Sequence, residues 1–520
     1  MNVAIIKALA MTEVRLRMRR TSTLVALLAV MAISWTMIVD PAGGSSLMTV
    51  NHARVLYTSS ALAIGSASFA CILFAFGGFY LARGRIAEDI RSGTGSVIGA
   101  TPVDSTTFLI GRWFGSVAYL GALVLAFMAT ILLLHVVRGD GPIEPHIYLF
   151  FYLVLLLPMV LFTASCATLF DSWAPLMGKG GDVLFFLLWA GQLGLVMPLV
   201  DAARGAVPLV ELLDFNGMGA VMLGTIHGLH SSNVSVGGGD FNAALAPITL
   251  PNVLWSAELL GTRVVTAVLA LAPLLLAVRV FHRFSPDKVK LSGSSKRRAP
   301  HTVLNQWLKP LSRLARPLFQ LGAWVPGMAG QVIADIALTL VAAPSAVLAL
   351  AASIVTALVV KQAVLAGVLL AAAIFWGILV CDLSTRDFGA GTEDMTGAVN
   401  GGVMGRYLRQ YCATMVLGLL FTGAIALRWS ATDPARALAV LAGIASLSAL
   451  ATMFGRCSRT SRLFMGLFLA WSYIALNGIR APMLDIIGSG GVANAPSMLA
   501  WLAAGGAALA AGYVWNRRTG

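Results

Sequence analysis

Residues 88–113 read EDIRSGTGSVIGATPVDSTTFLIGRW, and they lead from an apolar run at 59–82 into another at 108–135. Each run is long enough to cross a bilayer as a helix, because about 20 apolar residues span the hydrocarbon core. The segment between them mixes acids, arginines, glycines and a proline, which is more than a simple turn between two helices needs. The pattern predicts a helical membrane protein with a structured loop after its second span.

The composition of the whole chain agrees with this interpretation. Of its 520 residues, 58% are hydrophobic and 11% are charged, and the mean hydropathy is +0.84. Soluble domains carry about 25% charged residues, so a soluble fold would have to bury almost the entire chain. A β-barrel would show short alternating segments instead of long apolar runs. The sequence therefore predicts an all-α polytopic membrane protein.

The apolar runs predict about twelve transmembrane helices in two sets of six. The first set is expected at 21–39, 59–82, 108–135, 147–170, 181–200 and 256–281. The second set is expected at 343–360, 363–381, 409–428, 436–454, 463–479 and 497–515. Amphipathic interfacial helices are expected before each set, at 11–20 and 328–340, and another amphipathic segment is expected at 304–321.

The distribution of Lys and Arg predicts the orientation of the chain in the membrane. If the amino terminus is cytoplasmic, 28 of the 36 Lys and Arg residues lie on the inner side, as the positive-inside rule requires. We therefore expect both termini on the cytoplasmic side of a bacterial-type inner membrane, with membrane lipid around the chain. The net charge of +14 is spread over separate inner loops, so no nucleic-acid partner is expected.

Three short motifs recur in the same order in both halves of the chain. The matched pairs are 93–94 with 391–392, 99–100 with 397–398, and 111–112 with 405–406. The first two matches are 298 residues apart and the third is 294 residues apart, as a shortened loop in the second copy would produce. Because six is an even number of spans, the copies keep one orientation, and the sequence predicts two parallel six-helix repeats.

This repeat predicts three parts along the chain. Residues 1–281 would form the first six-helix half, and residues 327–520 the second half. Residues 282–326 would connect them as a cytoplasmic linker, since SPDKVKLSGSSKRRAPH is rich in Ser, Gly, Pro and charge. The outer segment 201–255 ends in a Gly- and Ser-rich stretch, and a partly ordered cap is expected there.

The quoted loop predicts a short helix held away from the membrane between two spans. Glu88, Asp89 and Arg91 suit the start of such a helix, with acids near its positive end. Gly93 and Gly95 permit a sharp turn. Thr101 should be extended because Pro102 follows it. Asp104 or Ser105 would then cap the next helix, so the short helix would be tied rigidly to two spans.

This loop resembles the signature loop of type-2 ABC exporter permeases, in which an acid precedes Gly-Thr, Ala-Thr-Pro and a small residue with Lys or Arg. The matching residues here are Glu88, Gly93, Thr94, Ala100, Thr101, Pro102, Gly111 and Arg112. The resemblance covers essentially the whole chain as two fused permease units. The second half departs from it, because Ala398, Val399 and Asn400 replace the Ala-Thr-Pro.

The resemblance implies an exporter subunit that performs no chemistry itself. Two copies of a cytoplasmic ABC ATPase would dock on the inner loops, carrying ATP and Mg, and an amphipathic or hydrophobic cargo would cross between the halves. The chain itself would hold no cofactor and no metal, and it lacks G-x-x-x-x-G-K-[ST], since its nearest match, Gly178-Lys179, has no upstream glycine. The implied coupling residues are Glu88, Asp89, Arg91, Gly93, Thr94, Thr101, Pro102, Arg112, Gly391, Thr392, Glu393, Asp394 and Arg406.

Spans two and five of each half would line the cargo route in such a permease. The candidates in this sequence are Ser59, Ser60, Ser66, Trp189, Gln192, Trp471, Tyr473 and Asn477. Packing between helices through small and polar residues is an equally good explanation for any one of them.

Two other classes of function remain as alternatives. A secondary active transporter also has twelve helices in two halves, but coupling to ions usually needs an ionisable group deep in the membrane. The nearest candidates are Glu258 and Arg263 at an outer end and Asp182 and Asp382 at inner ends. A membrane-embedded enzyme is the other alternative, with a metal site at His227 and His230 near Asp214 and Asp240 as its best candidate.

Overall fold

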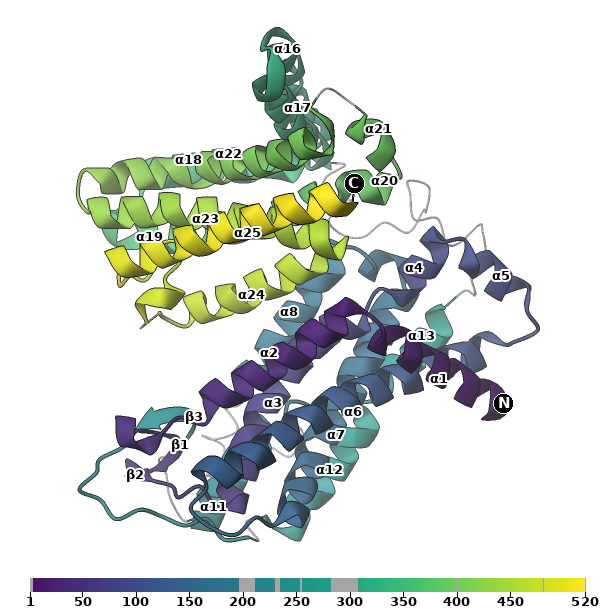
Figure 1. Cartoon of the computed structure of the whole chain (residues 1–520), viewed down its shortest axis with the longest axis vertical. Helices are drawn as coiled ribbons and strands as arrows, with labels where there is room; N and C mark the ends of the chain where they lie inside the picture. Colours follow the sequence, from purple (N-terminus) through teal and green to yellow (C-terminus); the bar gives the residue numbers. More distant parts are fainter. Residues whose placement is uncertain are drawn as a thin grey trace. The chain divides into compact units, whose positions relative to one another are not determined.

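The computed structural model describes residues 3–195, 211–229, 234–252, 255–281, 307–398, 401–479 and 481–519. These residues are almost entirely helical, with one small sheet (Figure 1). The chain divides into two compact units, Met1–Arg297 and Arg298–Gly520. The boundary between the units falls inside the expected linker.

Eight helical segments among the described residues are long and apolar enough to cross a membrane. They are Ser59–Arg91, Ser105–Arg138, Pro145–Ser172, Ala257–Val280, Gln362–Ala390, Gly402–Ser430, Pro434–Ser458 and Ala495–Arg518. Two sharply bent pairs raise the number to ten if each counts as one span: Val3–Met18 with Thr23–Met37, bent by 71°, and Gly327–Ala342 with Pro344–Val359, bent by 103°. The prediction of a helical chain with many helices of membrane-spanning length is confirmed, whereas twelve spans in two repeats stays a prediction, because these criteria give eight to ten spans among the described residues.

The helices of the first unit run back and forth between two ends. Its long helices are α2 (Thr21–Met37), α3 (Ser59–Ala82), α6 (Ser105–Arg138), α7 (Pro145–Ser172), α8 (Lys179–Gly194), α12 (Ala257–Leu269) and α13 (Ala272–Val280). Its other helices are α1 (Val3–Met18), α4 (Arg85–Arg91), α5 (Thr94–Ala100) and α11 (Met218–Leu229). The segment that contains α3 is central, because 78% of the residues in its most apolar stretch are buried. The segment Ala257–Val280 is peripheral, because only 22% of the corresponding residues are buried.

A three-stranded antiparallel sheet closes the end of the first unit opposite α4 and α5 (Figure 1). Its strands are β1 (Ser45–Val50), β2 (Ala53–Arg54) and β3 (Val234–Asp240), in the order β2-β1-β3. Asn51 and His52 form the tight turn between β1 and β2, and both have positive φ, as two-residue hairpins of this kind require. The all-α prediction did not include this sheet.

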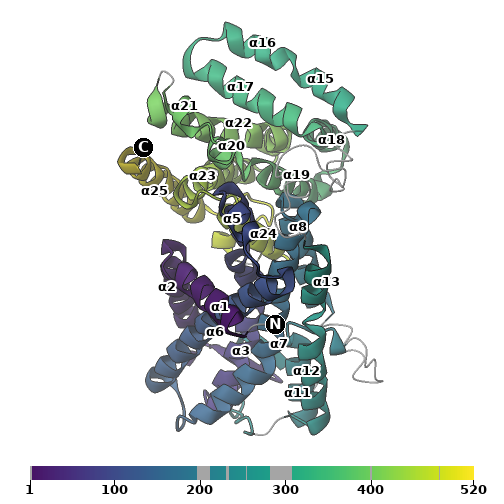
Figure 2. The same ribbon diagram turned by 90° about the vertical axis from the view of Figure 1, so that its right-hand side faces the viewer.

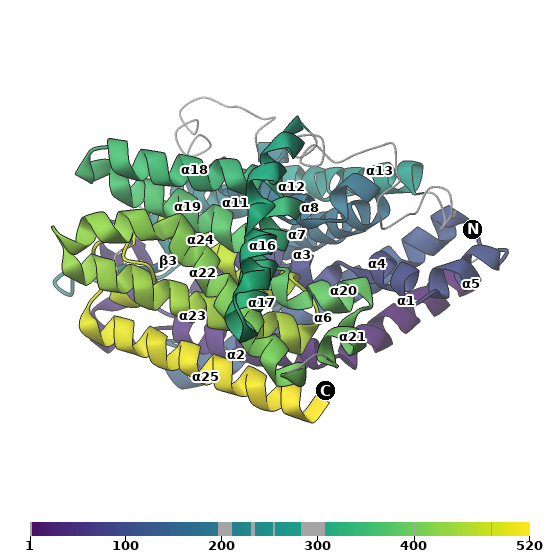
Figure 3. The same ribbon diagram turned by 90° about the horizontal axis from the view of Figure 1, so that it is seen from above.

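The second unit contains a bundle whose long helices run in nearly the same direction (Figure 3). They are α18 (Pro344–Val359), α19 (Leu365–Val380), α22 (Gly402–Ser430), α23 (Pro434–Ser458), α24 (Arg462–Leu476) and α25 (Ala495–Thr519). Shorter helices are α15 (Ser312–Ala315), α16 (Pro317–Trp324), α17 (Gly327–Ala342), α20 (Arg386–Ala390) and α21 (Glu393–Gly397). Helix α16 packs against α17 (Figure 2), so the amphipathic segment expected in the linker belongs to this compact unit.

Short 3₁₀ turns complete the described structure. They are η1 (Pro41–Gly43), η2 (Ala174–Leu176), η3 (Lys309–Leu311), η4 (Gln362–Val364), η5 (Leu383–Thr385) and η6 (Pro482–Leu484).

The long helix that follows the charged loop has equivalent neighbours in the two units. Helix α6 packs against α1, α2, α3 and α7, and helix α22 packs against α17, α18, α19 and α23. Helix α3 also contacts α8, as α19 contacts α24, and the last helix of each unit packs on α7 or α23. The expected fifth spans are shorter than the others: α8 has 16 residues and α24 has 15.

Candidate functional site

The loop quoted from the sequence forms two short helices, α4 and α5, at one end of the first unit (Figure 1). Gly93 separates them with a φ of +76°, and Thr101 ends α5 in an extended conformation before Pro102. The Asp104 carboxylate accepts a hydrogen bond from the Thr107 N–H at 2.9 Å and caps α6. The predicted turn, break and cap are confirmed, but α4 begins at Arg85 and Gly95 lies within α5.

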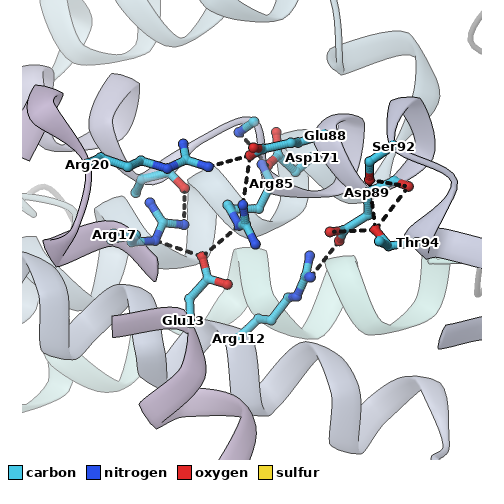
Figure 4. A network of polar contacts seen from close by, with 12 residues as sticks. Glu13, Arg17, Arg20, Arg85, Glu88, Asp89, Ser92, Thr94, Arg112 and Asp171 are labelled. Atoms are coloured by element: carbon cyan, nitrogen blue, oxygen red, sulfur yellow. Dashed lines mark hydrogen bonds and ion pairs between the residues drawn. The ribbon is translucent and has the colours of Figure 1, made fainter. Parts of the chain in front are cut away.

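An ion pair ties this loop to the long helix that follows it (Figure 4). Arg112, in the second turn of α6, lies 2.5 Å from the Asp89 carboxylate on α4. The Thr94 hydroxyl donates to the Asp89 carbonyl oxygen at 3.3 Å, which fixes the start of α5. The Arg112 guanidinium also covers the Phe108 ring. One acid therefore joins α4, α5 and α6.

Helix α1 is joined to the same loop by charged side chains (Figure 4). Glu13 accepts from Arg17 at 2.8 Å and lies 3.3 Å from Arg85. Arg17 also donates to the carbonyl oxygens of Leu81 and Ala82, at 2.8 and 2.6 Å. These carbonyls belong to the last turn of α3, where a helix has no further N–H groups to pair with them.

Further contacts connect the start of α4 with the adjoining ends of α7 and α8. The buried Arg83 side chain lies between the carboxylates of Asp171 and Asp182. Asp171 also accepts the backbone N–H groups of Gly84 and Arg85 at 2.6 and 3.0 Å. The loop and the Arg83 residue before it are thus connected by hydrogen bonds or ion pairs to α1, α6, α7 and α8, and the sequence did not identify these partners.

A cluster of buried apolar side chains lies next to the charged network and helps to hold the same helices together. Ile86, Phe108, Leu109 and Phe281 form a buried cluster, and Leu9 and Ile98 pack against it. Helix α1 crosses α6 closely at Gly111 and Gly115, where an added Cβ would lie 2.8 Å from the Leu9 Cβ and 2.6 Å from the Glu13 Cβ. Small residues four apart are a common way to bring two membrane helices together.

The corresponding loop of the second unit repeats several of these features. Gly391 has a φ of +69°, like Gly93. The Thr392 hydroxyl donates to the Asp387 carbonyl oxygen at 3.4 Å, and Thr392 and Asp387 lie 298 residues after Thr94 and Asp89. The exit from the loop differs, because Gly401 and Gly402, both with positive φ, lead into α22 where the first unit uses Thr-Pro.

Arginines of two long helices hold the second loop. Glu393 on α21 lies 3.3 Å from the Arg406 guanidinium on α22 and pairs with Arg456 at the end of α23. Arg406 also donates to the Glu393 carbonyl oxygen at 2.6 Å. On α17, Asp335 lies 2.8 Å from Arg409, so the helix before this bundle is joined to α22.

In the described part of each loop, one large apolar side chain on the second short helix is exposed. Val97 on α5 is 68% exposed, and Met395 on α21 is 74% exposed. The two positions are 298 residues apart, the same offset as the recurring Gly-Thr pairs. Neither residue was predicted, although the offset of 298 residues, applied along the loop, pairs Val97 with Met395.

The remaining coupling residues from the sequence lie on the same two loops. Arg91 and Asp394 are exposed, Glu88 pairs with Arg85 at 2.7 Å, and Thr101 donates to the Ile98 carbonyl oxygen at 2.7 Å. Val399 and Asn400 lie outside the described residues.

The candidate cargo residues mostly bond to neighbouring helices and loops. Ser60 donates to Asn252 at 2.7 Å, Ser66 lies 2.9 Å from the Tyr152 hydroxyl, and Trp189 donates to the Ile72 carbonyl oxygen at 3.3 Å. The side chains of Ser59, Trp471 and Asn477 donate to the carbonyl oxygens of Pro142, Leu484 and Tyr473, respectively. The Gln192 side chain accepts a hydrogen bond from the Phe215 N–H. Hydrogen bonds of this kind are common between packed helices. The role of these residues in a cargo route stays a prediction.

A second polar cluster lies between α7 and α12. Arg263 is 2% exposed and donates to the carbonyl oxygens of Val154, Leu155 and Asp214 at 3.4, 3.2 and 2.5 Å. The Val154 carbonyl is free to accept because Pro158, four residues later, has no N–H. The sequence placed Arg263 near the outer start of its span and did not predict this burial.

The candidate metal site is only partly covered by the structure. Within the described residues, no group of three or more His, Cys, Asp or Glu side chains is placed to hold a metal ion. His230 and the His227 side chain lie outside the described part of the chain.

Comparison with known proteins adds no family or relative to this geometry. No protein-family model matches the chain, and no significant match is found among curated proteins or solved structures.

Proposed function

We propose that this chain is the transmembrane permease subunit of an ABC exporter, with two parallel six-helix halves fused in one polypeptide. Separate ATPase subunits, two per chain and carrying ATP and Mg, would dock on the cytoplasmic loops and drive an amphipathic or hydrophobic cargo across the inner membrane. The observation that carries the proposal is the pair of loop helices α5 and α21, which share a left-handed glycine, a Thr-to-Asp hydrogen bond and an exposed apolar tip.

The exposed tips support docking of a soluble partner. Burying a Val or Met side chain contributes about 1.5–3 kcal/mol, so Val97 and Met395 would each add substantially to binding in a groove of a partner. Met395 lies on α21, which the Glu393–Arg406 ion pair holds, and Val97 lies on α5, which the Thr94 hydrogen bond to Asp89 joins to α4.

The charged network is consistent with a mechanism in which movement of such a partner displaces the loop and, through it, the long helices. In the first unit the loop is bonded to α1, α6 and α7, and Arg83, directly before α4, pairs with Asp182 on α8. A displacement of α5 would therefore reach several long helices without bending one isolated turn. A partner shifts a conformational equilibrium only by its different affinity for the two states, and nearly complete switching needs about 5.5 kcal/mol.

The equivalent neighbours of α6 and α22 support the twelve-helix, two-repeat architecture. Ten helices follow from the eight spans and the two bent pairs, and α8 and α24 would be the two remaining spans. In this arrangement both loops lie on the same side of the membrane, which the proposal places in the cytoplasm together with both termini.

Secondary active transport is the second candidate, because one observation favours it. Arg263 is buried beside the proline-containing helix α7 and lies in a helical segment of membrane-spanning length, and ionisable groups inside membrane spans often belong to transport pathways. Transport in proteoliposomes separates the two: an ABC exporter requires ATP and its ATPase, whereas a secondary transporter requires an ion gradient and no nucleotide. A membrane-embedded enzyme, the remaining alternative, has no specific observation in its favour.

The proposal is tested by replacing the loop tips with charge. Tagged wild-type chain should co-purify an ABC ATPase encoded beside its gene, and V97E and M395E should each reduce the recovered ATPase at least tenfold, because a desolvated carboxylate opposes docking. The matched control is L245E, an exposed leucine between β3 and α12, in a segment whose backbone bonds to the β1–β2 hairpin at His52 and Arg54. Absence of any ATPase with the wild type, or full recovery with both variants, would overturn the assignment.

A further inference from the structure

The helical segment before the second bundle has a surface that the coupling proposal does not use. Residues 309–324 form three consecutive elements, η3, α15 and α16. The segment packs against α17 (Figure 2). Three sides of this segment differ in chemistry.

One side is fixed against α17 by small residues. Ser312 and Ala315 are buried, and an added Cβ on Gly330 of α17 would lie 2.4 Å from the Gly322 carbonyl oxygen. The close backbone approach holds α16 in place. The other sides of the segment are therefore presented at defined positions.

The second side is apolar and exposed. Leu314 and Leu321 are seven residues apart, which places them in line along a helix, and Trp307 stands seven residues before Leu314, just ahead of η3. Trp324 lies one turn beyond Leu321. The two tryptophans at the ends of the row are 81% and 82% exposed, and Leu314 is 68% exposed.

The third side is basic. Lys309, Arg313 and Arg316 follow at spacings of four and three residues, and all three are exposed. No Asp or Glu occurs in the sequence between Asp287 and Asp335. This part of the chain therefore carries positive charge without acids to balance it.

We infer that this surface, formed by Trp307, Leu314, Leu321 and Trp324 with Lys309, Arg313 and Arg316, binds the anionic phospholipid headgroups of the membrane around the protein. Tryptophan is enriched where acyl chains meet headgroups, and an apolar row beside a basic row suits a helix lying in that layer. The basic residues are complementary to lipid phosphates, and long basic side chains reach headgroups while their stems remain apolar. The inference does not rest on the proposed ATPase docking.

The test uses the full chain purified in detergent and titrated with phosphatidylglycerol or phosphatidylcholine, with the midpoint of thermal stabilisation as readout. R313Q/R316Q should raise the phosphatidylglycerol midpoint roughly 30-fold, as expected for two lost headgroup contacts, and leave the phosphatidylcholine midpoint unchanged. R313K/R316K should keep the wild-type midpoints. The matched control is R517Q/R518Q, two exposed arginines at the end of α25.

A second variant examines the apolar row. W307A/W324A should weaken the stabilisation by both lipids, because the lost contact is with acyl chains. A wild-type phosphatidylglycerol midpoint in R313Q/R316Q, or an equal shift in R517Q/R518Q, would overturn the inference. Loss of a co-purifying protein from R313Q/R316Q with unchanged lipid midpoints would show that a protein covers this surface, and would overturn it equally.

Discussion

Glu393 shows how a single side chain organises the second loop. It lies on α21 and meets arginines from the start of α22 and the end of α23. Burial alone would raise the pKa of the Glu393 carboxyl, but the hydrogen bond and charge of Arg456, with the charge of Arg406, outweigh burial and hold that pKa below its ordinary value. The loop is therefore held most firmly when this carboxyl is ionised.

A pH-dependent contribution to stability follows from the lowered pKa of Glu393. An unfolded Glu titrates near 4.3, so the contribution is fully present above about pH 4.3 and is lost as pH falls through the lower folded pKa. At neutral pH, E393Q should destabilise the chain by on the order of 1 kcal/mol, the size expected for a partly exposed ion pair. Thermal unfolding of both proteins between pH 3 and 7 measures the difference.

The matched control for E393Q is D394N, which removes the neighbouring exposed carboxylate. D394N should leave the neutral-pH stability within about 0.5 kcal/mol of wild type, as is usual at exposed positions. A stability gap between wild type and E393Q that stays constant down to pH 3 would contradict the assigned direction.

Residue types in the loops could be predicted better than their partners. Gly93 and Gly391 matched in sequence and share the left-handed conformation, which costs other residues about 1–2 kcal/mol. Asp104 was predicted as a cap because a cap bonds within a few residues of itself. Glu13 with Arg85, and Arg83 with Asp182, join residues far apart in sequence, and no local pattern pairs such residues.

At the scale of elements, the contact between α7 and α12 depends on a proline and an arginine. Pro158 leaves the Val154 carbonyl without its helical partner, and Arg263 donates to that oxygen. Arg263 also bonds to the carbonyl oxygen of Asp214, just before α11, and lies near the Asp214 carboxylate. This one side chain therefore holds three segments of the first unit together.

Removing Arg263 should be severely destabilising. R263Q removes the buried donor to the carbonyl oxygens of Val154, Leu155 and Asp214, and each buried polar group left unsatisfied costs about 1–3 kcal/mol. In the R263Q background, P158A should recover about 1 kcal/mol, because residue 158 then supplies an N–H to Val154. Unfolding in increasing mole fractions of a denaturing detergent measures each variant.

Arg428 provides the matched control for Arg263. It also donates to carbonyl oxygens at a helix end, those of Ala357 and Val360, but it is only partly buried. R428Q should therefore cost about 1 kcal/mol. An equal loss in R263Q and R428Q, or no recovery by P158A, would show that Arg263 does not act through burial and the freed carbonyl.

Helices and helix ends could be predicted where a short stretch of sequence determines them. Long apolar runs gave the membrane helices, and Thr101 before Pro102 gave the break after α5. The sheet was missed because β1 (Ser45–Val50) pairs with β3 (Val234–Asp240), and the two strands are far apart in the sequence. The short hairpin strand Ala53–Arg54 and the Gly-rich β3 also lack the alternation that marks a longer strand.

At the scale of the whole molecule, the chain divides into two compact units at Arg297 and Arg298. The sequence placed a linker at 282–326 from its Ser, Gly, Pro and charge content. In the structure, residues 309–324 instead pack on α17 within the second unit. Composition marks where a chain leaves a bundle, but it does not show that a later segment returns to pack against a helix.

Two units with separate cores should each survive the loss of their covalent connection. A specific protease site inserted between Ser294 and Ser295 would cut close to the boundary between the units, and the length of a connection has little effect on stability because loop closure entropy varies slowly with length. After cleavage, size-exclusion chromatography in detergent should show no aggregation, and the thermal transitions should move by less than about 3 °C, the size of a sub-kcal/mol change.

A site inserted after Thr460 is the control, because it cuts within the second unit between α23 and α24, which pack against each other. That cut should lower the transition of the second unit, and loss of either fold after the Ser294 cut would contradict two independently folded units.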